Sequence, residues 1–412
     1  MFVDESIISR LLKLPPGKRT DDVLYYILAP HLLGFWTFLK PKHKGKELGD
    51  VLYIFGDVCL IFEAKTREKA EPANEKWIRE KLKEGVTQIS RNHCSFKNGD
   101  VPTLRNPWRG EVSWDSLGVK YFQGIIVLMH DSEPYDPKEL EPELFSSAPL
   151  PIHVISLLDM NKLVRFINTP WDFIVYWEFR KIFGKEYELP VHREQSIYWG
   201  ILNNWIELAK SQGTAFPESK IKEDRQFLEA YTEVLTRSGC PDEKIKQKVA
   251  ASYLMDIATG SLMQKADQDA SGKRVGSKNH ESLIKTVETL TELSRLRRAE
   301  YGFAWLNCAK ECIVSRKDIR RTWFSPTRKQ SYIVHASYNQ DVNEELLLSI
   351  AARRLAEDES TLAIGLSATA ENIIHTYESV RSSIDGSDFE TDFSKILNSK
   401  AVIIERTINT IE

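Results

Sequence analysis

The chain has 412 residues, which exceeds the usual size of one hydrophobic core, so we expect two or three domains. Its apolar content of 42% and charged content of 28% are typical of a globular protein. The formal net charge of −3 argues against binding of nucleic acid through an overall positive field. Any contact with nucleic acid must therefore come from local basic patches.

The sequence also lacks the features of membrane proteins and of disulfide-rich secreted proteins. No stretch approaches the roughly 20 apolar residues that span a bilayer, and the first residues lack the basic and apolar regions of a secretory signal. The 5 cysteines are odd in number and scattered, unlike a disulfide framework. We therefore expect a cytoplasmic protein with no membrane partner.

A helix and a strand are predicted near the start of the chain. Thr20 is suited to cap a helix whose first turn carries Asp21 and Asp22, because carboxylates are favourable near a helix N-terminus. The apolar run Gly34–Leu39 then predicts a first strand.

The next stretch, ELGDVLYIFGDVCLIFEAK, predicts a β-hairpin. Two apolar runs, Val51–Phe55 and Val58–Phe62, flank the dipeptide Gly56-Asp57, which is typical of a two-residue hairpin turn. Both runs are apolar at nearly every position, as in strands that are covered on both faces.

This turn would bring three charged residues together at one end of the hairpin. Pairing outward from the turn places Asp50 opposite Glu63. Lys65 points to the same side as Glu63, whereas Ala64 points away, because side chains alternate along a strand. Two facing carboxylates beside an apolar core need a compensating cation, which Lys65 and a divalent metal would supply. The alternative is a buried salt bridge between Glu63 and Lys65, with Asp50 as a surface acid.

These residues resemble the PD-(D/E)xK nuclease superfamily, whose members have the restriction-endonuclease-like fold. Its pattern is an acid at the start of one strand and a D/E-x-K tripeptide on the next, as in Asp50 and Glu63-Ala64-Lys65. Gly49 stands where a proline usually precedes the first acid. The resemblance is best over residues 20 to 130.

The resemblance implies a metal site and a catalytic lysine. Asp50, Glu63 and the backbone carbonyl of Ala64 would bind Mg²⁺ or Mn²⁺, which prefer hard oxygen ligands. Lys65 would orient the attacking water or stabilise the transition state. Gln88, on a helix expected over Glu75–Asn92, would point into the site as in some branches of the superfamily. The alternative for Gln88 is an ordinary solvent-facing side chain.

The region after this helix predicts a long loop and then a buried strand. Between Cys94 and Val119 the chain is polar and rich in Gly, Pro and Trp, and loops of that length are often functional. Arg105, Trp108 and Arg109 are candidates for contact with a nucleic-acid backbone or base. Alternatively, Trp108 and Trp114 only fix the loop to the body of the domain.

The rest of the first domain alternates strands and helices. Tyr121–Met129 is a continuous apolar strand that completes the helix-strand-strand-strand-helix-strand order of the superfamily core. A strand over Ile152–Leu158 leads to Asp159, which would cap a helix over Asn161–Ile167. Thr169-Pro170 begins another helix, which ends at Gly184. We expect a domain boundary near residue 190.

Residues 191–315 are predicted to form a helical domain, and residues 316–412 a small α/β domain. The segment Arg316–Lys329 is the most basic, and its Arg320, Arg321 and Trp323 suit phosphate contact and base stacking. The alternative is a solvated charged face. The remaining elements expected here are a strand at Tyr332–Ser337, a helix at Asn343–Ala356, and strands at Thr361–Leu366 and Ala401–Glu405.

The predicted fold class is α/β (α+β): a restriction-endonuclease-like core, then a helical region, then a small α/β domain. The resemblance implies a Mg²⁺-dependent endonuclease, with DNA favoured over RNA, and it admits a homo-oligomer. The architecture, a nuclease joined to a large unrelated module, is typical of regulated effectors in microbial antiviral defence. One alternative is a non-catalytic nucleic-acid-binding or scaffold protein with a degenerate nuclease-like core. Another is a sensor whose C-terminal half binds a nucleotide signal or a partner protein.

Overall fold

The computed structural model groups the described residues into two compact units, one up to residue 242 and one after it. Each unit is described by itself. The described ranges are 23–28, 32–43, 46–66, 75–99, 103–129, 141–167, 169–183, 247–256, 258–260, 295–325, 330–338, 362–384 and 400–405, with the single positions 287, 290 and 293.

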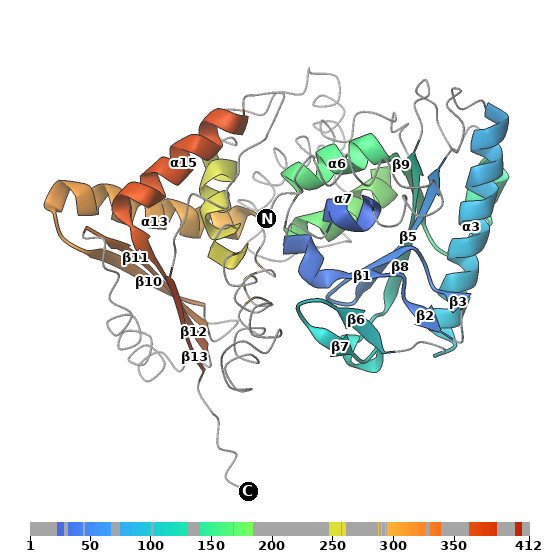
Figure 1. Cartoon of the computed structure of the whole chain (residues 1–412), viewed down its shortest axis with the longest axis horizontal. Helices are drawn as coiled ribbons and strands as arrows, with labels where there is room; N and C mark the ends of the chain where they lie inside the picture. The colour runs from blue at the N-terminus through green and yellow to red at the C-terminus, as the bar shows by residue number, and fades with distance from the viewer. Residues whose placement is uncertain are drawn as a thin grey trace, which may run out of the picture. The chain divides into compact units, whose positions relative to one another are not determined.

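A mixed sheet of five strands forms the centre of the first unit in its described part, in the order β1-β4-β5-β8-β9 (Figure 1). The first three strands pair in antiparallel fashion, and β5, β8 and β9 run parallel. The strand bounds are β1 Thr37–Leu39, β4 Val51–Phe55, β5 Val58–Thr66, β8 Tyr121–Met129 and β9 Ile152–Ser156. A short ribbon of β2 (Lys42–His43) and β3 (Lys46–Glu47) lies between β1 and β4 in the chain.

The hairpin of β4 and β5 has the predicted register. Phe55 pairs with Val58 across the turn Gly56-Asp57, and the ladder continues outward to Val51 with Phe62. Every residue of β4 is buried, as expected for a strand that is covered on both faces. The strand Tyr121–Met129 is also confirmed, with the predicted bounds.

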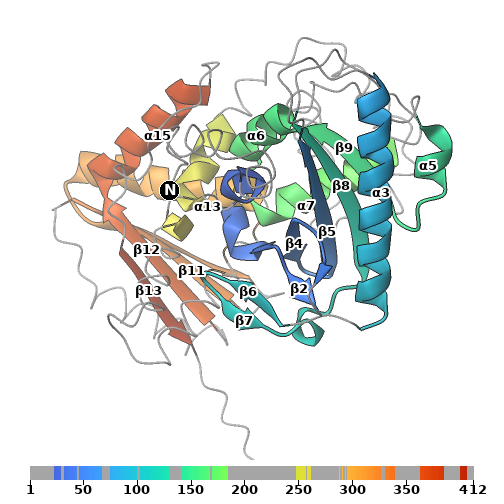
Figure 2. The same cartoon turned by 45° about the vertical axis from the view of Figure 1, so that its right-hand side comes forward.

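Helices cover both faces of this sheet. Helix α3 (Glu75–Lys97) packs on β5 and β8, and α6 (Leu157–Phe166) and α7 (Pro170–Phe183) lie on the opposite side (Figure 2). The α3 face buries aliphatic residues of the strands and helix, whereas Tyr53 and Phe62 on the other face contact the ring of Phe173 in α7. The apolar runs of the sequence are thus buried on both sides.

Two predictions about the elements before and after α3 are wrong in detail. The predicted first strand begins as a 3-10 helix, η1 (Leu32–Trp36), and only Thr37–Leu39 pairs in the sheet. The predicted long loop holds the strands β6 (Leu104–Asn106) and β7 (Gly110–Val112) and the 3-10 helix η2 (Asp115–Leu117).

Asn106 explains why that loop is ordered. Its side-chain oxygen accepts hydrogen bonds from the backbone N–H groups of Trp108 at 2.9 Å and Arg109 at 3.0 Å, which closes the turn. Its amide nitrogen donates to the carbonyls of Gly34, Phe35 and Thr37 at 2.8–3.3 Å. One buried side chain therefore joins this hairpin to the beginning of the sheet.

The predicted cap of α6 is also corrected. The strand before it ends at Ser156, and the Ser156 hydroxyl oxygen accepts the backbone N–H of Asp159 at 3.0 Å, so the helix begins at Leu157. Asp159 lies in the first turn and accepts a hydrogen bond from the Ser156 hydroxyl. Helix α7 begins at Pro170 as predicted. The short helix α5 (Pro142–Ser146) precedes β9.

The second unit contains a smaller mixed sheet. In its described part the order is β10-β11-β12-β13, with β11 and β12 parallel and the outer pairs antiparallel. The helices α13 and α15 pack on this sheet. The bounds are α13 Arg295–Ser315, β10 Ile319–Ser325, β11 Gln330–Ser337, β12 Leu362–Thr369, α15 Ala370–Ile384 and β13 Lys400–Glu405.

The mixed α/β class is confirmed, including helical structure in the middle of the chain and a small C-terminal mixed sheet. Thr20, Asp21, Asp22, residue 190 and the helix expected at Asn343–Ala356 lie outside the described residues. The domain boundaries at residues 190 and 315 stay predictions. No described helix combines the length and the apolar character that a bilayer crossing needs.

Candidate active site

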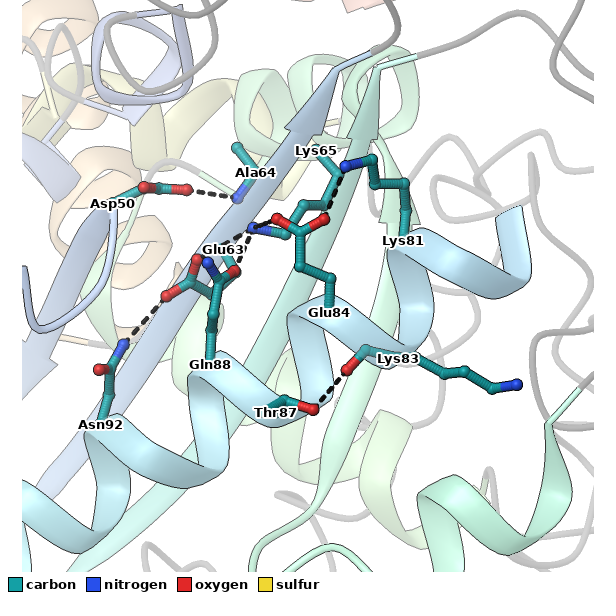
Figure 3. Close-up of polar contacts among 10 residues, drawn as sticks. All are labelled: Asp50, Glu63, Ala64, Lys65, Lys81, Lys83, Glu84, Thr87, Gln88 and Asn92. Carbon is teal, nitrogen blue, oxygen red and sulfur yellow. Dashed lines mark hydrogen bonds and ion pairs between the residues drawn. The ribbon is translucent and has the colours of Figure 1, made fainter. Parts of the chain in front are cut away.

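Asp50 is held where β4 meets the neighbouring strands. Its backbone N–H donates to the carbonyl of Phe62 at 3.0 Å, and its carbonyl accepts the N–H of Lys40 at 2.9 Å. Its carboxylate Oδ2 accepts the N–H of Ala64 at 2.7 Å (Figure 3). The regular ladder between β4 and β5 ends at Val51. Beyond it the backbone N–H of Ala64 in β5 is bound by the Asp50 side chain, not by a backbone carbonyl of β4.

Gly49 permits this arrangement. It has a φ of +124°, a conformation that side chains with a Cβ atom rarely adopt. A proline is fixed near φ −65° and is excluded from this position. The absence of the proline that usually precedes the first acid therefore has a local structural reason.

Glu63 and Lys65 form a buried ion pair on the side of β5 that faces α3 (Figure 3). The ammonium of Lys65 lies 3.2 Å from Glu63 Oε2, and the two side chains are only 7% and 5% exposed. The other Glu63 oxygen, Oε1, accepts a hydrogen bond from the amide of Asn92 at 3.0 Å. Both charged residues of the predicted D/E-x-K tripeptide, Glu63 and Lys65, are thus fixed in position.

Helix α3 supplies the remaining partners through residues spaced four apart. Gln88 Oε1 accepts a hydrogen bond from the Lys65 ammonium, and Glu84 Oε1 lies 3.6 Å from the same nitrogen. Residues 84, 88 and 92 share one face of the helix because they are one turn apart. Gln88 therefore points into the predicted site rather than into solvent.

The close approach of α3 to the sheet depends on a glycine. A Cβ atom on Gly85 would lie 2.8 Å from the side chain of Ile126 in β8. The missing side chain lets the helix axis come near the strands, which brings Gln88 and Asn92 within hydrogen-bonding distance of β5.

Glu84 lies at the exposed end of this charged group. Its Oε2 accepts a hydrogen bond from the ammonium of Lys81 at 2.6 Å. Burial raises the pKa of Glu84, but the ammonium groups of Lys81 and Lys65 outweigh it, so the net pKa lies below the ordinary value for a glutamate. Glu84 is therefore ionised at neutral pH and bridges two cations.

The oxygen-bearing groups near the C-terminal end of β5 suit a hard cation. Asp50 and Glu63 offer carboxylate oxygens, and the carbonyl of Ala64 faces the Asp50 side because both polar groups of a strand residue point to the same neighbour. No cluster of three or more His, Cys, Asp or Glu side chains suited to a metal occurs among the described residues. Mg²⁺ is commonly held by only one or two carboxylates, with water and substrate phosphate as further ligands, so these residues fit it.

The two arginines proposed for nucleic-acid contact in the first unit have different surroundings. Arg105 is exposed on β6. The guanidinium of Arg109 lies over the rings of Trp36 at 4.6 Å and Phe35 at 5.4 Å, so it stabilises the packing of the turn between β6 and β7 on η1. Trp114 stacks on Phe96 at 4.7 Å, as in the alternative interpretation that it fixes this region to the body of the domain.

The basic segment of the second unit forms strand β10. Arg321 is exposed and pairs with Glu311 of α13 at 2.7 Å. Arg320 is exposed and its Cα is paired with His335 of β11. Trp323 lies in β10, and its side chain is outside the described residues. Contact of these residues with nucleic acid or a nucleotide stays a prediction.

Sequence reasoning missed Asn92 and Glu84. The signal was present, because both lie four residues from Gln88 on the same predicted helix. What the sequence could not supply was the distance of this helix from β5. Comparison of the chain with protein-family models, with curated proteins and with solved structures finds no match. Function must therefore be inferred from the site itself.

Proposed function

We propose that the first unit is a Mg²⁺-dependent nuclease that hydrolyses phosphodiester bonds in nucleic acid, with DNA favoured over RNA. The observation that carries the proposal is that Asp50, Glu63 and Lys65 come together at one end of the β4–β5 hairpin. Asp50 binds the backbone of Ala64, and Lys65 forms an ion pair with Glu63 and a hydrogen bond with Gln88. These are the residues that the resemblance to PD-(D/E)xK nucleases selects.

The order of elements supports a restriction-endonuclease-like core. A helical segment at residues 23–28 is followed by β1, β4, β5, α3 and β8, which is the order helix-strand-strand-strand-helix-strand. The pairing also fits, since the first three strands are antiparallel and β8 adds in parallel to β5. Gly49 departs from the pattern, but its positive φ explains why proline is absent.

Each residue has a defined task in the proposed reaction. Asp50 and Glu63 would hold the metal, and the Ala64 carbonyl would add a third oxygen ligand. When bound, Mg²⁺ lowers the pKa of a coordinated water and neutralises charge on the scissile phosphate. The Lys65 ammonium lies 3.2 Å from the Glu63 carboxylate, beside the proposed metal position, where it would stabilise negative charge in the transition state.

Asn92 and Gln88 position the two central charges. Asn92 donates to one Glu63 oxygen and thereby fixes the plane of that carboxylate. Gln88 accepts from Lys65 and limits the positions that its ammonium can take. Both side chains come from α3, so the helix acts as the rigid support of the site.

A test compares cleavage of plasmid DNA, single-stranded DNA and RNA by the full chain with Mg²⁺, Mn²⁺ or EDTA. Asp50→Asn and Lys65→Met should each lower metal-dependent cleavage by about 100-fold or more. Asp57→Asn and Lys120→Met are matched controls, because both residues are exposed at the turn end of the hairpin. Wild-type protein inert on every substrate, or Asp50→Asn as active as Asp57→Asn, would refute the nuclease proposal.

A second candidate is a non-catalytic nucleic-acid-binding or scaffold protein with a nuclease-like core. The observation that favours it is that the Lys65 ammonium already has several partners: it donates hydrogen bonds to Glu63 and Gln88 and forms an ion pair with Glu84 at 3.6 Å. Such a network is also found where an ion pair only supports a fold. Binding of DNA without cleavage under any metal would favour this candidate.

The second unit is proposed to regulate the first. It has its own sheet and helices, and a nuclease joined to an unrelated module is typical of effectors in microbial defence that await a trigger. Thermal-shift screening with mononucleotides and cyclic oligonucleotides tests whether β10 binds a signal. Stabilisation that Arg320→Ala with Arg321→Ala abolishes would support a nucleotide signal, and the absence of any shift would argue for a partner protein.

A further inference from the structure

The ion-pair network at the site ends in a carboxylate that two lysines share. Glu84 directs one oxygen at the Lys65 ammonium, 3.6 Å away, and the other at the Lys81 ammonium, 2.6 Å away (Figure 3). Two non-bridging oxygens of one phosphate group have the same capacity to meet two ammonium groups. Glu84 therefore has the charge and the bridging geometry of a bound phosphate.

The acceptors around Lys65 differ in how easily they can leave. Glu63 is 5% exposed and is also bound by Asn92, so it is held on both of its oxygens. Glu84 is 42% exposed and lies farther from the Lys65 nitrogen, so it loses less burial than Glu63 would if it rotated into water. An incoming anion would therefore displace Glu84 and leave Glu63 in place.

Lys81 is the cation of α3 whose position suits this exchange. It is 30% exposed and forms an ion pair with Glu84 itself. Of its neighbours on the helix, Arg79 pairs with Glu75 at 2.6 Å and with Glu141 at 3.3 Å, and Lys83 pairs with Glu141 at 3.3 Å. When Glu84 moves away, Lys81 would gain a new anionic partner at the same place.

We propose that Lys65 and Lys81 form a binding site for a backbone phosphate of the nucleic-acid substrate, and that Glu84 occupies this site until substrate displaces it. The inference rests on the proposed nuclease function and adds to it a phosphate-binding residue, Lys81, and a competing carboxylate, Glu84. Substrate binding then replaces the Glu84 carboxylate with a phosphate between Lys65 and Lys81. Breaking the ion pairs of Glu84 adds a cost to binding that depends on the salt concentration.

Binding of a short fluorescein-labelled DNA duplex to the full chain, measured by anisotropy in EDTA and again in Ca²⁺ over a series of salt concentrations, tests the site. Lys81→Gln should weaken binding and reduce the slope of log K against log salt by about 1, as for loss of one phosphate contact. Glu84→Gln should tighten binding about threefold at low salt, because the competing charge is removed while the shape is kept.

Two control variants carry the same changes of charge elsewhere in the unit. Lys120→Gln alters a lysine that is 71% exposed at the turn end of the hairpin, and Glu143→Gln alters an exposed glutamate of α5. If Lys81→Gln binds no more weakly than Lys120→Gln, or Glu84→Gln no more tightly than Glu143→Gln, the phosphate site is refuted.

The same experiment separates failure of this site from failure of the nuclease proposal. If the wild-type protein cleaves DNA but the two variants match their controls, the phosphate site is wrong and the nuclease proposal stands. If the variants differ from their controls as expected while no metal supports cleavage, the phosphate site stands and the nuclease proposal is wrong. Wild-type protein that binds no nucleic acid refutes both.

Discussion

Replacement of Lys65 by methionine tests the charge network in the folded protein directly. Methionine keeps much of the apolar stem but removes an ammonium that is 7% exposed and 3.2 Å from the Glu63 carboxylate. Removal of one member of a buried ion pair typically costs about 3–5 kcal/mol, since the other charge stays buried. We expect the lower end, about 3 kcal/mol, because Asn92 still donates to Glu63.

The loss of stability in Lys65→Met can be measured as a decrease in Tm, and a double-mutant cycle with Glu63 isolates the contribution of the ion pair. For a domain of this size, about 3 kcal/mol corresponds to a decrease in Tm of roughly 6–12 °C. Glu63→Gln added to Lys65→Met removes both charges, so the double variant should recover part of the lost stability. The coupling free energy in the double-mutant cycle should be on the order of 1–3 kcal/mol.

The assay is hydrogen exchange of β4 and β5 peptides over a series of urea concentrations, which reports on the first unit separately from the second. A control, Lys120→Met, changes an exposed lysine of the same unit and should alter stability by less than about 0.5 kcal/mol. If Lys65→Met is as stable as this control, or if the double variant is no more stable than Lys65→Met, the buried ion-pair interpretation is wrong.

Three further predictions concern pH, thiol reactivity and the β6–β7 hairpin. Burial lowers the pKa of His335 below its usual range. As the pH falls below about 6.5, the histidine of the unfolded chain takes up a proton more readily than the buried ring, so the second unit should lose stability. His335→Gln should remove this loss, measured by hydrogen exchange of β11. Burial raises the pKa of the Cys59 thiol, so iodoacetamide at neutral pH should label exposed Cys94 before Cys59, as read by mass spectrometry. Asn106→Ala should lower the free energy of unfolding by about 3 kcal/mol in urea denaturation, because several buried backbone groups lose their partner. Asn98→Ala, at the exposed residue that follows α3, should have little effect in the same assay.

The β4–β5 hairpin and the strand β8 could be predicted because their signals are local. The dipeptide Gly56-Asp57 between two apolar runs determines the register, and a continuous apolar run identifies a strand that is buried on both faces. These features depend on residues that are close in the sequence, so one chain suffices to derive them.

The features that could not be predicted depend on backbone conformation or on contacts between distant segments. The carboxylate of Asp50 turns to the backbone of Ala64 because Gly49 adopts a positive φ, which the pattern of apolar residues does not encode. Asn106 joins segments about seventy residues apart. The role of Glu84 depends on how closely α3 approaches the sheet.

The most direct test of the central claim is a crystal structure of the protein soaked in Mn²⁺, with anomalous scattering recorded near the manganese edge. We expect an anomalous peak bounded by the carboxylates of Asp50 and Glu63 and the carbonyl of Ala64, and its loss in Asp50→Asn. Saturating Mn²⁺ that leaves these three groups without a peak, in crystals where the wild-type hairpin is ordered, would contradict the account.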